Sequence, residues 1–580
     1  MSQHKGDQWS SKVGVIFAVA GGAVGLGNFL RFPGLAAQYG GGAFMVAYLI
    51  SLLLLGLPVA WAEWSLGRRG GAMGSNTAPG IYWYLTKGSK PWKMLGVISV
   101  LGPTSIAFYY LVVEAWCFGY FWKILTGVES FSSASSTEKI FSDFVGMHAN
   151  GSAFHSGSLL IGCLLFSILL NLGIIYRGIN KGVELFCRWV IPFLLLISVV
   201  LLVKVLFLGT PDPTHPERNI EEGFGYMWNP NKTVVESREV INGEESWKTQ
   251  TALPANNPER RTQLIAEVKN SKGELRLTEV SLLKGLENID LWLAAAGQVF
   301  LSLSVGTGLI LTYSSYLKKN DDIALSAVTA AACNETCEVG LAGMISVPAA
   351  VAFLGIAGAA GQSTFALGFV ALPQVFAHMT VGGLFGSLFF LLLSLAAVTS
   401  SISMMQVGLA FFEEFMGLKR RMAAVILGFF TCMGALVVTW FSHDLTALNS
   451  YDFWIGTMCF FLSAMTMIIL FSWKLDVKAS IADINSTSDI SIPSIYRFIL
   501  KFVTPSLLAI LLLSWLIRNI WGKPAAPIRA LMEGNIGAVI PVFLLGAYAV
   551  FLLCVTMASS RHKSWPPSKK KQEKDRTISK

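Results

Sequence analysis

Long apolar stretches recur along the whole chain, and they constrain its fold more than any other feature. A helix that crosses the hydrocarbon core of a membrane needs about 20 mostly apolar residues. Such stretches start near Val13, Phe44, Leu95, Leu159, Val183, Leu291, Ile323, Leu384, Ala423, Phe453, Tyr496 and Ile536. Only 14% of the residues are charged, against about 25% in soluble proteins. The sequence therefore predicts an all-α, multi-pass integral membrane protein with about twelve transmembrane helices.

Lys and Arg are distributed unevenly among the predicted loops. The loops that follow the even-numbered helices are rich in both residues, and the short loops on the other side are nearly free of them. Because Lys and Arg remain on the cytoplasmic side, we expect a cell-membrane protein with both termini in the cytoplasm. The net charge of +9 is then a topology signal, and the Lys-rich tail is expected near anionic membrane lipid rather than nucleic acid.

Glycines interrupt the first and the sixth predicted helix near their middles. The first reads AGGAVGLGNFLRFP from Ala20, and the sixth reads GQVFLSLSVGTG from Gly297. These helices are the first members of two consecutive sets of five, and interruptions at matching positions are typical of inverted-repeat transporters. The alternative, close packing of helices through small residues, explains the break less well because Asn28 and Arg31 follow the glycines directly.

A helix broken inside the membrane offers unpaired backbone groups, which are tolerated where they line a cavity or bind a ligand. Free N–H groups at the start of a half-helix attract a carboxylate. Free carbonyl groups at the end of a half-helix suit a hard cation such as sodium. Gly25 and Gly27 lack the Cβ atoms that would block close approach, and Asn28 adds a neutral side-chain oxygen.

Several segments resemble the neurotransmitter:sodium symporter family, which has the LeuT-type fold with a 5+5 inverted repeat and unwound helices 1 and 6. The segments that carry the resemblance are, in family order, GAVGLGNFLRFP, GLPVAWAEWSLGR, GQVFLSLSVGTGLILTYSSY, AACNETCEVG, LGFVALPQVF, AAVTSSISMMQ and LNSYDFWIGT. The resemblance runs from about Trp9 to the tenth helix. Within the family, the chain resembles the bacterial amino-acid transporters. It implies a sodium-coupled symporter of a small neutral amino acid that works by alternating access.

The resemblance also implies two sodium sites, with no organic cofactor. The first would use the carbonyl of Ala23, the side chains of Asn28, Ser302 and Asn334, and the substrate carboxylate. The second would use the carbonyls of Gly21, Val24 and Ala396 and the hydroxyls of Thr399 and Ser400. Thr399 and Ser400 by themselves could equally bond within their own helix.

The implied substrate site lies between the same elements. The carboxylate of the amino acid would meet the N–H groups of Leu26 and Gly27 and the hydroxyl of Tyr110. Its amine would meet the carbonyls of Ala23, Leu301 and Ser304. The remaining lining residues would be Gly25, Ile106, Ser302, Thr307, Ser400 and Met404. Glu63 and Glu114 also lie in predicted helices, and we interpret both as buried structural carboxylates.

Two gates follow from the resemblance, and the inner one departs from the family pattern. Arg31 and Asp452 would close the outer pathway. The family usually has an Arg just before the N-terminal Trp, where this chain has Gly6, so we expect Lys5 and Glu414 to form the inner pair. Two further departures, Leu301 for an aromatic lid and Thr307 for a Phe, favour a side-chain pocket of modest size.

Glu338 occupies the position at which chloride-dependent relatives have a Ser. A fixed carboxylate there would repel chloride strongly in a low-dielectric site, so the sequence predicts chloride-independent transport. Glu338 lies four residues after Asn334, on the same helix face. The alternative is that Glu338 faces solvent at a helix end.

Other functions remain open at this stage. A sensor that kept the fold and lost transport is one, and a symporter for another small zwitterion is a second. A biogenic-amine symporter needs an acidic residue where this chain has Gly25. We expect no enzymatic activity, since no Ser/His/Asp, Cys/His or metal-ligand arrangement is present. The substrate, the sodium stoichiometry and the oligomeric state stay undetermined.

Hydropathy and the resemblance divide the chain into five parts. They are a cytoplasmic N-terminal segment (1–12), a transporter core of helices 1–10 (13–475), a cytoplasmic connector (476–495), helices 11 and 12 (496–558) and a basic cytoplasmic tail (559–580). Within the core, residues 209–288 are expected to form an extended external loop.

Overall fold

The computed structural model describes Trp9 and residues 12–559, except 130, 132, 157, 214, 217, 242–243, 254–257, 272, 363 and 523. In this part of the chain, 10 helices are long and apolar enough to cross a membrane, and a bent pair makes up to 11. A further apolar span is divided between two shorter helices, Ile289–Ser302 and Leu309–Ser314. Every predicted apolar stretch is thus helical, and the predicted membrane fold is confirmed.

The first set of five spans covers the chain as far as residue 206. Its elements, with π-helical turns labelled η, are α1 (Lys12–Ala23), η1 (Gly27–Arg31), α2 (Phe32–Gln38), α3 (Gly42–Ser51), η2 (Leu52–Gly56), α4 (Leu57–Ala72), α5 (Ala78–Leu85), α6 (Lys90–Leu95), α7 (Ile98–Thr126), α8 (Ala134–Val145), α9 (Ser152–Ser156), α10 (Ser158–Tyr176), η3 (Ile179–Glu184) and α11 (Leu185–Leu206).

The second set begins with the divided helix, and two more spans follow it. Its elements are α15 (Ile289–Ser302), α16 (Leu309–Ser314), α17 (Ala324–Glu335), η4 (Thr336–Gly343), α18 (Met344–Ala360), α19 (Thr364–Ala366), η5 (Leu367–Ala371), α20 (Leu372–Ala377), α21 (Gly382–Phe415), α22 (Arg420–Trp440), η6 (His443–Leu445, a 3-10 turn), α23 (Thr446–Tyr451), η7 (Asp452–Cys459), α24 (Phe460–Ile469) and η8 (Leu470–Lys474). The last part contains α25 (Val477–Asn485), α26 (Ile495–Phe498), η9 (Ile499–Val503), α27 (Thr504–Trp521), α28 (Ala526–Met532) and α29 (Ile536–Ala558).

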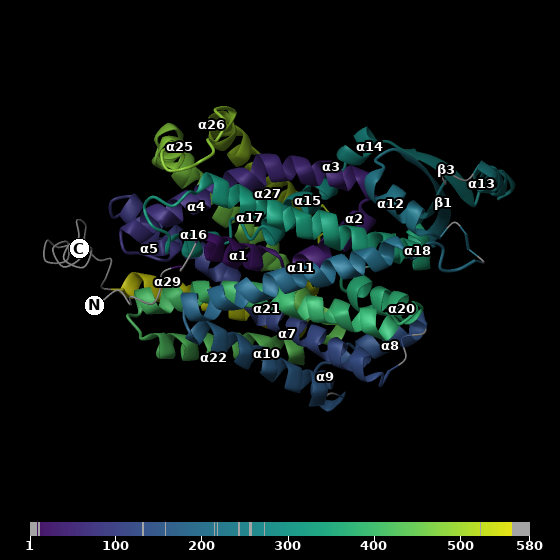
Figure 1. Ribbon diagram of the computed structural model, residues 1–580, viewed down its shortest axis with the longest axis horizontal. Helices are drawn as coiled ribbons and strands as arrows, with labels where there is room; N and C mark the ends of the chain where they lie inside the picture. The colour runs from purple at the N-terminus through teal and green to yellow at the C-terminus, as the bar shows by residue number, and fades with distance from the viewer. Residues whose placement is uncertain are drawn as a thin grey trace, which may run out of the picture.

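The long helices run side by side along the long axis of the molecule (Figure 1). Burial separates the centre of this bundle from its periphery. The most apolar windows of α7 and α21 are 89% and 83% buried, whereas that of α29 is only 28% buried. A helix that is apolar all round and exposed on most of its surface is suited to lipid. The centre of the bundle therefore lies around α7 and α21, and α1 packs against α21 there.

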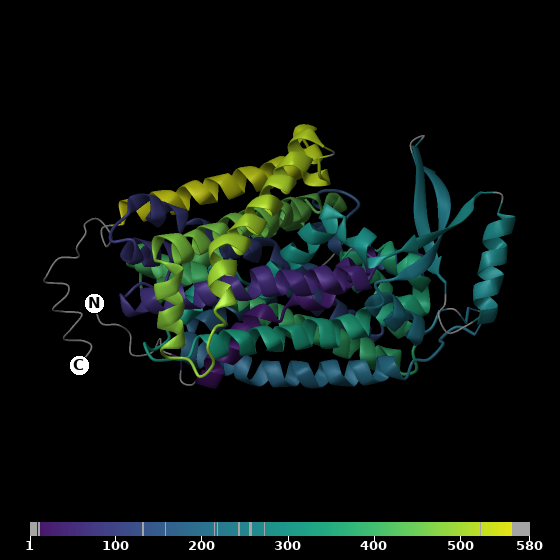
Figure 2. The same cartoon turned by 90° about the horizontal axis from the view of Figure 1, so that it is seen from above.

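The segment between the fifth and sixth spans is folded, whereas the sequence predicted an extended loop. It contains α12 (Ile220–Trp228), β1 (Lys232–Ile241), β2 (Glu244–Ala252), α13 (Pro258–Asn270), β3 (Leu275–Val280) and α14 (Leu282–Leu286). The strands form an antiparallel sheet in the order β2-β1-β3. Val235, Leu253 and Leu264 make a small separate core. We call residues 232–280 the β domain; it lies at the end of the bundle opposite α5 and α25 (Figures 1 and 2).

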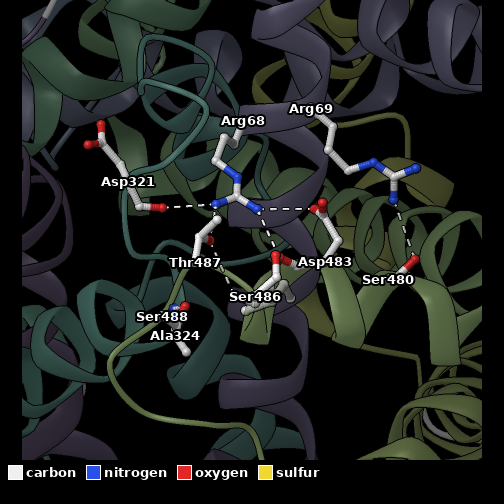
Figure 3. Close-up of polar contacts among 10 residues, drawn as sticks. Arg68, Arg69, Asp321, Ala324, Ser480, Asp483, Ser486, Thr487 and Ser488 are labelled. Carbon is white, nitrogen blue, oxygen red and sulfur yellow. Dashed lines mark hydrogen bonds and ion pairs between the residues drawn. The ribbon is translucent and has the colours of Figure 1, made fainter.

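Arg68, near the carboxyl end of α4, joins three segments at the other end of the bundle (Figure 3). Its guanidinium donates to the carbonyl of Asp321 at 2.9 Å, to the hydroxyl of Thr487 at 2.6 Å and to the carboxylate of Asp483 at 3.0 Å. Arg68 is 3% exposed, so these partners replace its water. Arg69 is less buried and donates to the hydroxyl of Ser480 at 3.4 Å. Arg68 is thus one of the residues that tie the connector around α25 to the bundle, together with the hydrogen bonds of Ser488 and Asp489 to Ala324 and Asp322.

We expect Arg68→Ala to destabilise the folded protein more than Arg69→Ala, its matched neighbour. Hydrogen bonds to a charged group contribute about 1.5–3 kcal/mol each, and Arg68→Ala removes several of them. The measurement is the apparent melting temperature of both variants in detergent. Equal melting temperatures for the two variants would show that the Arg68 contacts do not hold the connector.

Candidate functional site

The break in the first span is stabilised by side chains from the same turn and from α7. α1 ends at Ala23, and helical structure resumes at Gly27. The N–H of Gly25 donates to the Oδ1 of Asn28 at 2.9 Å, and the N–H of Leu26 donates to the hydroxyl of Tyr110 at 3.0 Å. A Cβ on Gly25 would lie 2.3 Å from the Oγ of Ser400. Only glycine therefore lets α1 approach α21 this closely.

The break in the sixth span is stabilised by a buried carboxylate from α4. Glu63 accepts hydrogen bonds from the N–H groups of Gly306 at 2.8 Å, Gly308 at 2.8 Å and Leu311 at 3.3 Å. Gly306 and Gly308 have positive φ, which suits glycine. The negative charge lies at the N-terminus of α16, where it is favourable. This agrees with the structural role expected for Glu63.

The two breaks contact each other through Ser304, and Thr307 bonds to Ser304 within the second break. The hydroxyl of Ser304 donates to the carbonyl of Gly22 at 2.9 Å, and the hydroxyl of Thr307 donates to the carbonyl of Ser304 at 2.6 Å. Both residues are buried. The structure therefore brings together the two interrupted helices that the sequence identified separately.

The side chains expected at the first sodium site form one buried cluster. The Nδ2 of Asn28 donates to the Oδ1 of Asn334 at 2.8 Å, and the Nδ2 of Asn334 donates to the Oγ of Ser302 at 3.4 Å. Asn28, Ser302 and Asn334 are fully buried, and Ala23 is buried at the end of α1. Neutral oxygens thus gather beside the break in the first span.

The oxygens expected at the second site lie between α1 and α21. The hydroxyl of Thr399 lies 3.5 Å from the carbonyl oxygen of Val24 and 2.9 Å from that of Ala396. The hydroxyl of Ser400 lies 3.4 Å from the carbonyl oxygen of Gly21. Within the described ranges there is no group of three or more His, Cys, Asp or Glu that could hold a metal ion. Both clusters instead consist of uncharged oxygens.

The other expected lining residues come from α7, α15 and α21. Ile106 and Met404 are buried on the same helices as Tyr110 and Ser400. Leu301 and Gly27 are partly exposed, and a Cβ on Gly27 would lie 3.6 Å from the Cδ2 of Leu301.

Glu338 is buried among the polar side chains of the first cluster. Its carboxylate accepts from the Nε2 of Gln298 at 2.6 Å, from the Nδ2 of Asn334 at 3.1 Å and from the Nδ2 of Asn28 at 3.3 Å. The alternative in which Glu338 faces solvent is therefore wrong. The sequence reasoning missed Glu335, which accepts from the hydroxyl of Tyr48 at 3.1 Å. Glu335 lies three residues before Glu338, on the same helix face, and this spacing could have indicated that the two carboxyl groups lie close together.

The expected gates differ in their contacts. Arg31 and Asp452 form no direct ion pair among the described residues; Asp452 accepts instead from the hydroxyl of Tyr109 at 2.9 Å. Glu414 is buried and accepts from the hydroxyls of Ser75 at 2.7 Å and Thr77 at 2.9 Å. Lys5 lies outside the described residues.

The model of the sodium:neurotransmitter symporter family matches residues 6–158 and 276–552. The chain belongs to this family. The unmatched interval, 159–275, includes most of the β domain but not the greater part of β3. A sodium-dependent transporter of Haemophilus influenzae is 27% identical over 87% of this chain and 97% of its own length. The transporter YhdH of Bacillus subtilis is 25% identical over 89% of this chain and 98% of its own.

The solved structures include a similar fold. The crystal structure of MhsT in complex with L-phenylalanine matches with a TM-score of 0.68 and 25% identity, covering 88% of this chain and 99% of MhsT. The LeuT-type fold expected from the sequence is confirmed by this match. As a member of the symporter family, the protein is a sodium-dependent membrane transporter.

We expect Gly25→Ala to abolish sodium-dependent substrate binding while the protein still folds, because its Cβ would collide with Ser400 and Tyr110. Gly297→Ala is the matched control. A Cβ on Gly297 would have no atom within 4 Å apart from its chain neighbours and the backbone of its own helix. Binding of labelled substrate to the purified variants checks the prediction. Normal binding by the Gly25 variant would show that the site lies elsewhere.

Proposed function

We propose that this protein is a sodium-coupled symporter of a small neutral amino acid that works by alternating access without chloride. The observation that carries the proposal is the pair of neutral oxygen clusters on either side of the break in the first span. The substrate would bind between these clusters, where the free backbone groups of the two broken helices meet.

The spacing of the oxygens supports sodium at the second cluster. A hard cation of this size holds its ligand oxygens at about 2.4 Å, which puts neighbouring oxygens about 3.4 Å apart. Thr399 and Ser400 lie at 3.5 and 3.4 Å from the carbonyl oxygens of Val24 and Gly21. Bound sodium would take the place of these weak hydrogen bonds. The other sodium ion would bind at the first cluster, to Asn28, Ser302, Asn334 and Ala23.

An amino-acid zwitterion fits the polar groups at the breaks. Its carboxylate would accept from the N–H groups of Leu26 and Gly27 and from Tyr110, whose hydroxyl now accepts from the N–H of Leu26. Its amine would donate to carbonyls of Ala23, Leu301 and Ser304. That MhsT was crystallised with L-phenylalanine supports an amino-acid substrate. The site contains no acidic residue at Gly25, which disfavours an amine without a carboxylate.

Exposure around the site is asymmetric, as alternating access requires. Gly27, Leu301 and Arg31 are partly exposed, whereas Gly21 to Leu26 are buried. On the other side of the breaks, the Nε1 of Trp9 donates to the carbonyl of Tyr313 at 3.1 Å. We infer that this state is open toward Arg31 and closed at Trp9. The Arg31–Asp452 pair would form when the substrate is enclosed, and Glu414 would belong to the inner gate.

The orientation of the chain follows from its Lys and Arg residues. We propose that the end with α5, α25 and Arg68 faces the cytoplasm of a bacterial cell, and that the β domain is external. The positive-inside rule supports this arrangement.

Substrate binding should require sodium. The positive charge of the ion at the first cluster would offset the repulsion between the substrate carboxylate and Glu338. We expect a panel of labelled neutral amino acids, phenylalanine included, to bind in sodium chloride and not in potassium chloride. Asn28→Ala should weaken binding by at least about tenfold, as it removes a sodium ligand. Equilibrium binding to purified protein is the measurement. Undiminished binding in potassium would contradict the symporter proposal.

Glu338 should make chloride unnecessary. Its carboxylate already occupies the polar pocket formed by Asn28, Gln298 and Asn334, and a chloride ion there would be repelled. Replacing chloride by gluconate should leave wild-type uptake unchanged. Uptake by Glu338→Ser should be slow without chloride and increase several-fold with it. Strong chloride dependence of the wild type would remove this assignment.

A further inference from the structure

The β domain and α12 are docked on the outer half of the broken first span. α2 ends at Gln38, and the turn that follows leads into α3. The hydroxyl of Tyr226, in α12, donates to the carbonyl of Ala37 at 2.5 Å. The Nζ of Lys232, at the start of β1, donates to the carbonyl of Gly40 at 2.7 Å and to that of Tyr226 at 3.0 Å.

The Lys232 amine is held by three contacts of two kinds. Besides the two carbonyls, it lies 3.9 Å from the ring centroid of Tyr226. Lys232 is half-buried, and burial lowers the pKa of its amine to about 7, so these partners take the place of part of its water. A donor or cation near the carboxyl end of a helix interacts favourably with its last carbonyl groups. Lys232 therefore holds the turn that follows α2, while Tyr226 bonds to Ala37 in the last turn of α2.

The backbones at this junction are in very close contact. A Cβ on Gly41 would lie 1.9 Å from the carbonyl oxygen of Tyr226, and a Cβ on Gly42 would lie 2.4 Å from the backbone of Asn229. Such distances leave no space for a side chain or for water. The turn between α2 and α3 is thus fitted to the segment between α12 and β1.

The same segment is also attached to the second and seventh spans. In α12, a Cβ on Gly223 would lie 2.5 Å from the Cα of Pro348 in α18. In α14, a Cβ on Gly285 would lie 2.7 Å from the Cβ of Ala43 in α3. The N–H of Leu282 donates to the Oδ1 of Asn231 at 2.9 Å, which ties the exit of the β domain to its entrance. The outer ends of three spans therefore meet on one folded unit.

We propose that Lys232 and Tyr226 are positioning residues that clamp α2 to α3 and α18, so that the outer half of the broken helix moves together with the second and seventh spans. We call these two side chains and their contacts the α2 clamp. α2 follows directly after Arg31, and η1 carries Asn28. The clamp thus sets the position of the gate and of a sodium ligand relative to α7 and α21, which carry the other half of the site.

The role of the clamp in transport rests on the proposed symport. Closing the outer pathway would require the whole clamped unit to move toward α7 and α21. α2 also packs directly against α18 and is joined by a short turn to α3. Loss of the clamp would therefore loosen α2 from these spans rather than free it, and less of the energy of substrate binding would be transmitted to them. Loss of the clamp should therefore slow transport more than it weakens binding.

The test uses Lys232→Met in the full-length protein, with Lys232→Arg as the conservative variant and Lys269→Met as the control. Lys269 is an exposed lysine on α13 of the same domain. Hydrogen–deuterium exchange of the peptides covering residues 32–42 is the first measurement. We expect exchange to be faster by about tenfold in Lys232→Met, near wild type in Lys232→Arg and unchanged in Lys269→Met. Tyr226→Phe should give a smaller increase in the same peptides.

The second measurement is the maximal rate of uptake against the substrate dissociation constant. Lys232→Met should lower the maximal rate several-fold and leave the dissociation constant within about twofold, with recovery in Lys232→Arg. Unchanged exchange of residues 32–42 in folded Lys232→Met would overturn the clamp. So would an equal effect of Lys269→Met. If no amino acid is transported at all, the symport proposal fails, while the exchange experiment still decides whether the clamp exists.

Discussion

The structure depends on how it satisfies the backbone groups that two broken helices leave unpaired inside an apolar bundle. Each unpaired N–H or C=O group costs free energy away from water, so a break persists only where partners are supplied. Glu63 supplies three acceptor contacts at the sixth span, and Asn28 and Tyr110 supply acceptors at the first. The carbonyl groups that remain near Gly21 and Val24 face hydroxyls of α21. The proposed cation site is the part of the break that hydrogen bonds do not fully satisfy.

The acidic side chains of the site lie near one oxygen cluster and not near the other. The two oxygen clusters are neutral, and carboxyl groups lie beside only one of them, at Glu338 and Glu335. Glu338 accepts hydrogen bonds from three amide side chains, so its carboxylate is fixed in place rather than mobile. Because a buried carboxylate needs either partners or a cation, Glu338 and the proposed sodium ion would stabilise each other.

The β domain shows how a segment outside the membrane bundle can contact a broken helix. Most of it, residues 232–275, lies in the interval that the family model does not match, and its first residue, Lys232, contacts the turn that follows the broken helix. Its own core is small, and the segments that flank it, α12 with the turn after it and α14, make close contacts with the bundle. A domain attached in this way can influence the position of α2 without lining the substrate site.

Local sequence predicted the membrane spans and the two breaks, because hydropathy and glycine are local signals. The residues proposed to line the site came from the resemblance of the motifs to the symporter family, and their role stays a prediction. The motifs identified Asn28, Asn334 and Glu338 as members of one site, although they lie on two different spans. Sequence did not predict the fold of residues 232–280, whose strands contain charged residues and lack a strict alternation of polar and apolar side chains. Nor did it predict the roles of Glu335, Tyr109 and Lys232.

Only the tertiary structure decided those contacts. Tyr48 and Glu335 lie on different spans, Tyr109 reaches Asp452 across the bundle, and Lys232 reaches Gly40 from a separate domain. Each contact joins groups that are far apart in the chain, and no local preference encodes such a distance. The sequence by itself determined which backbone groups would be left unpaired in the membrane. The packing of the helices decided which side chains would pair with them.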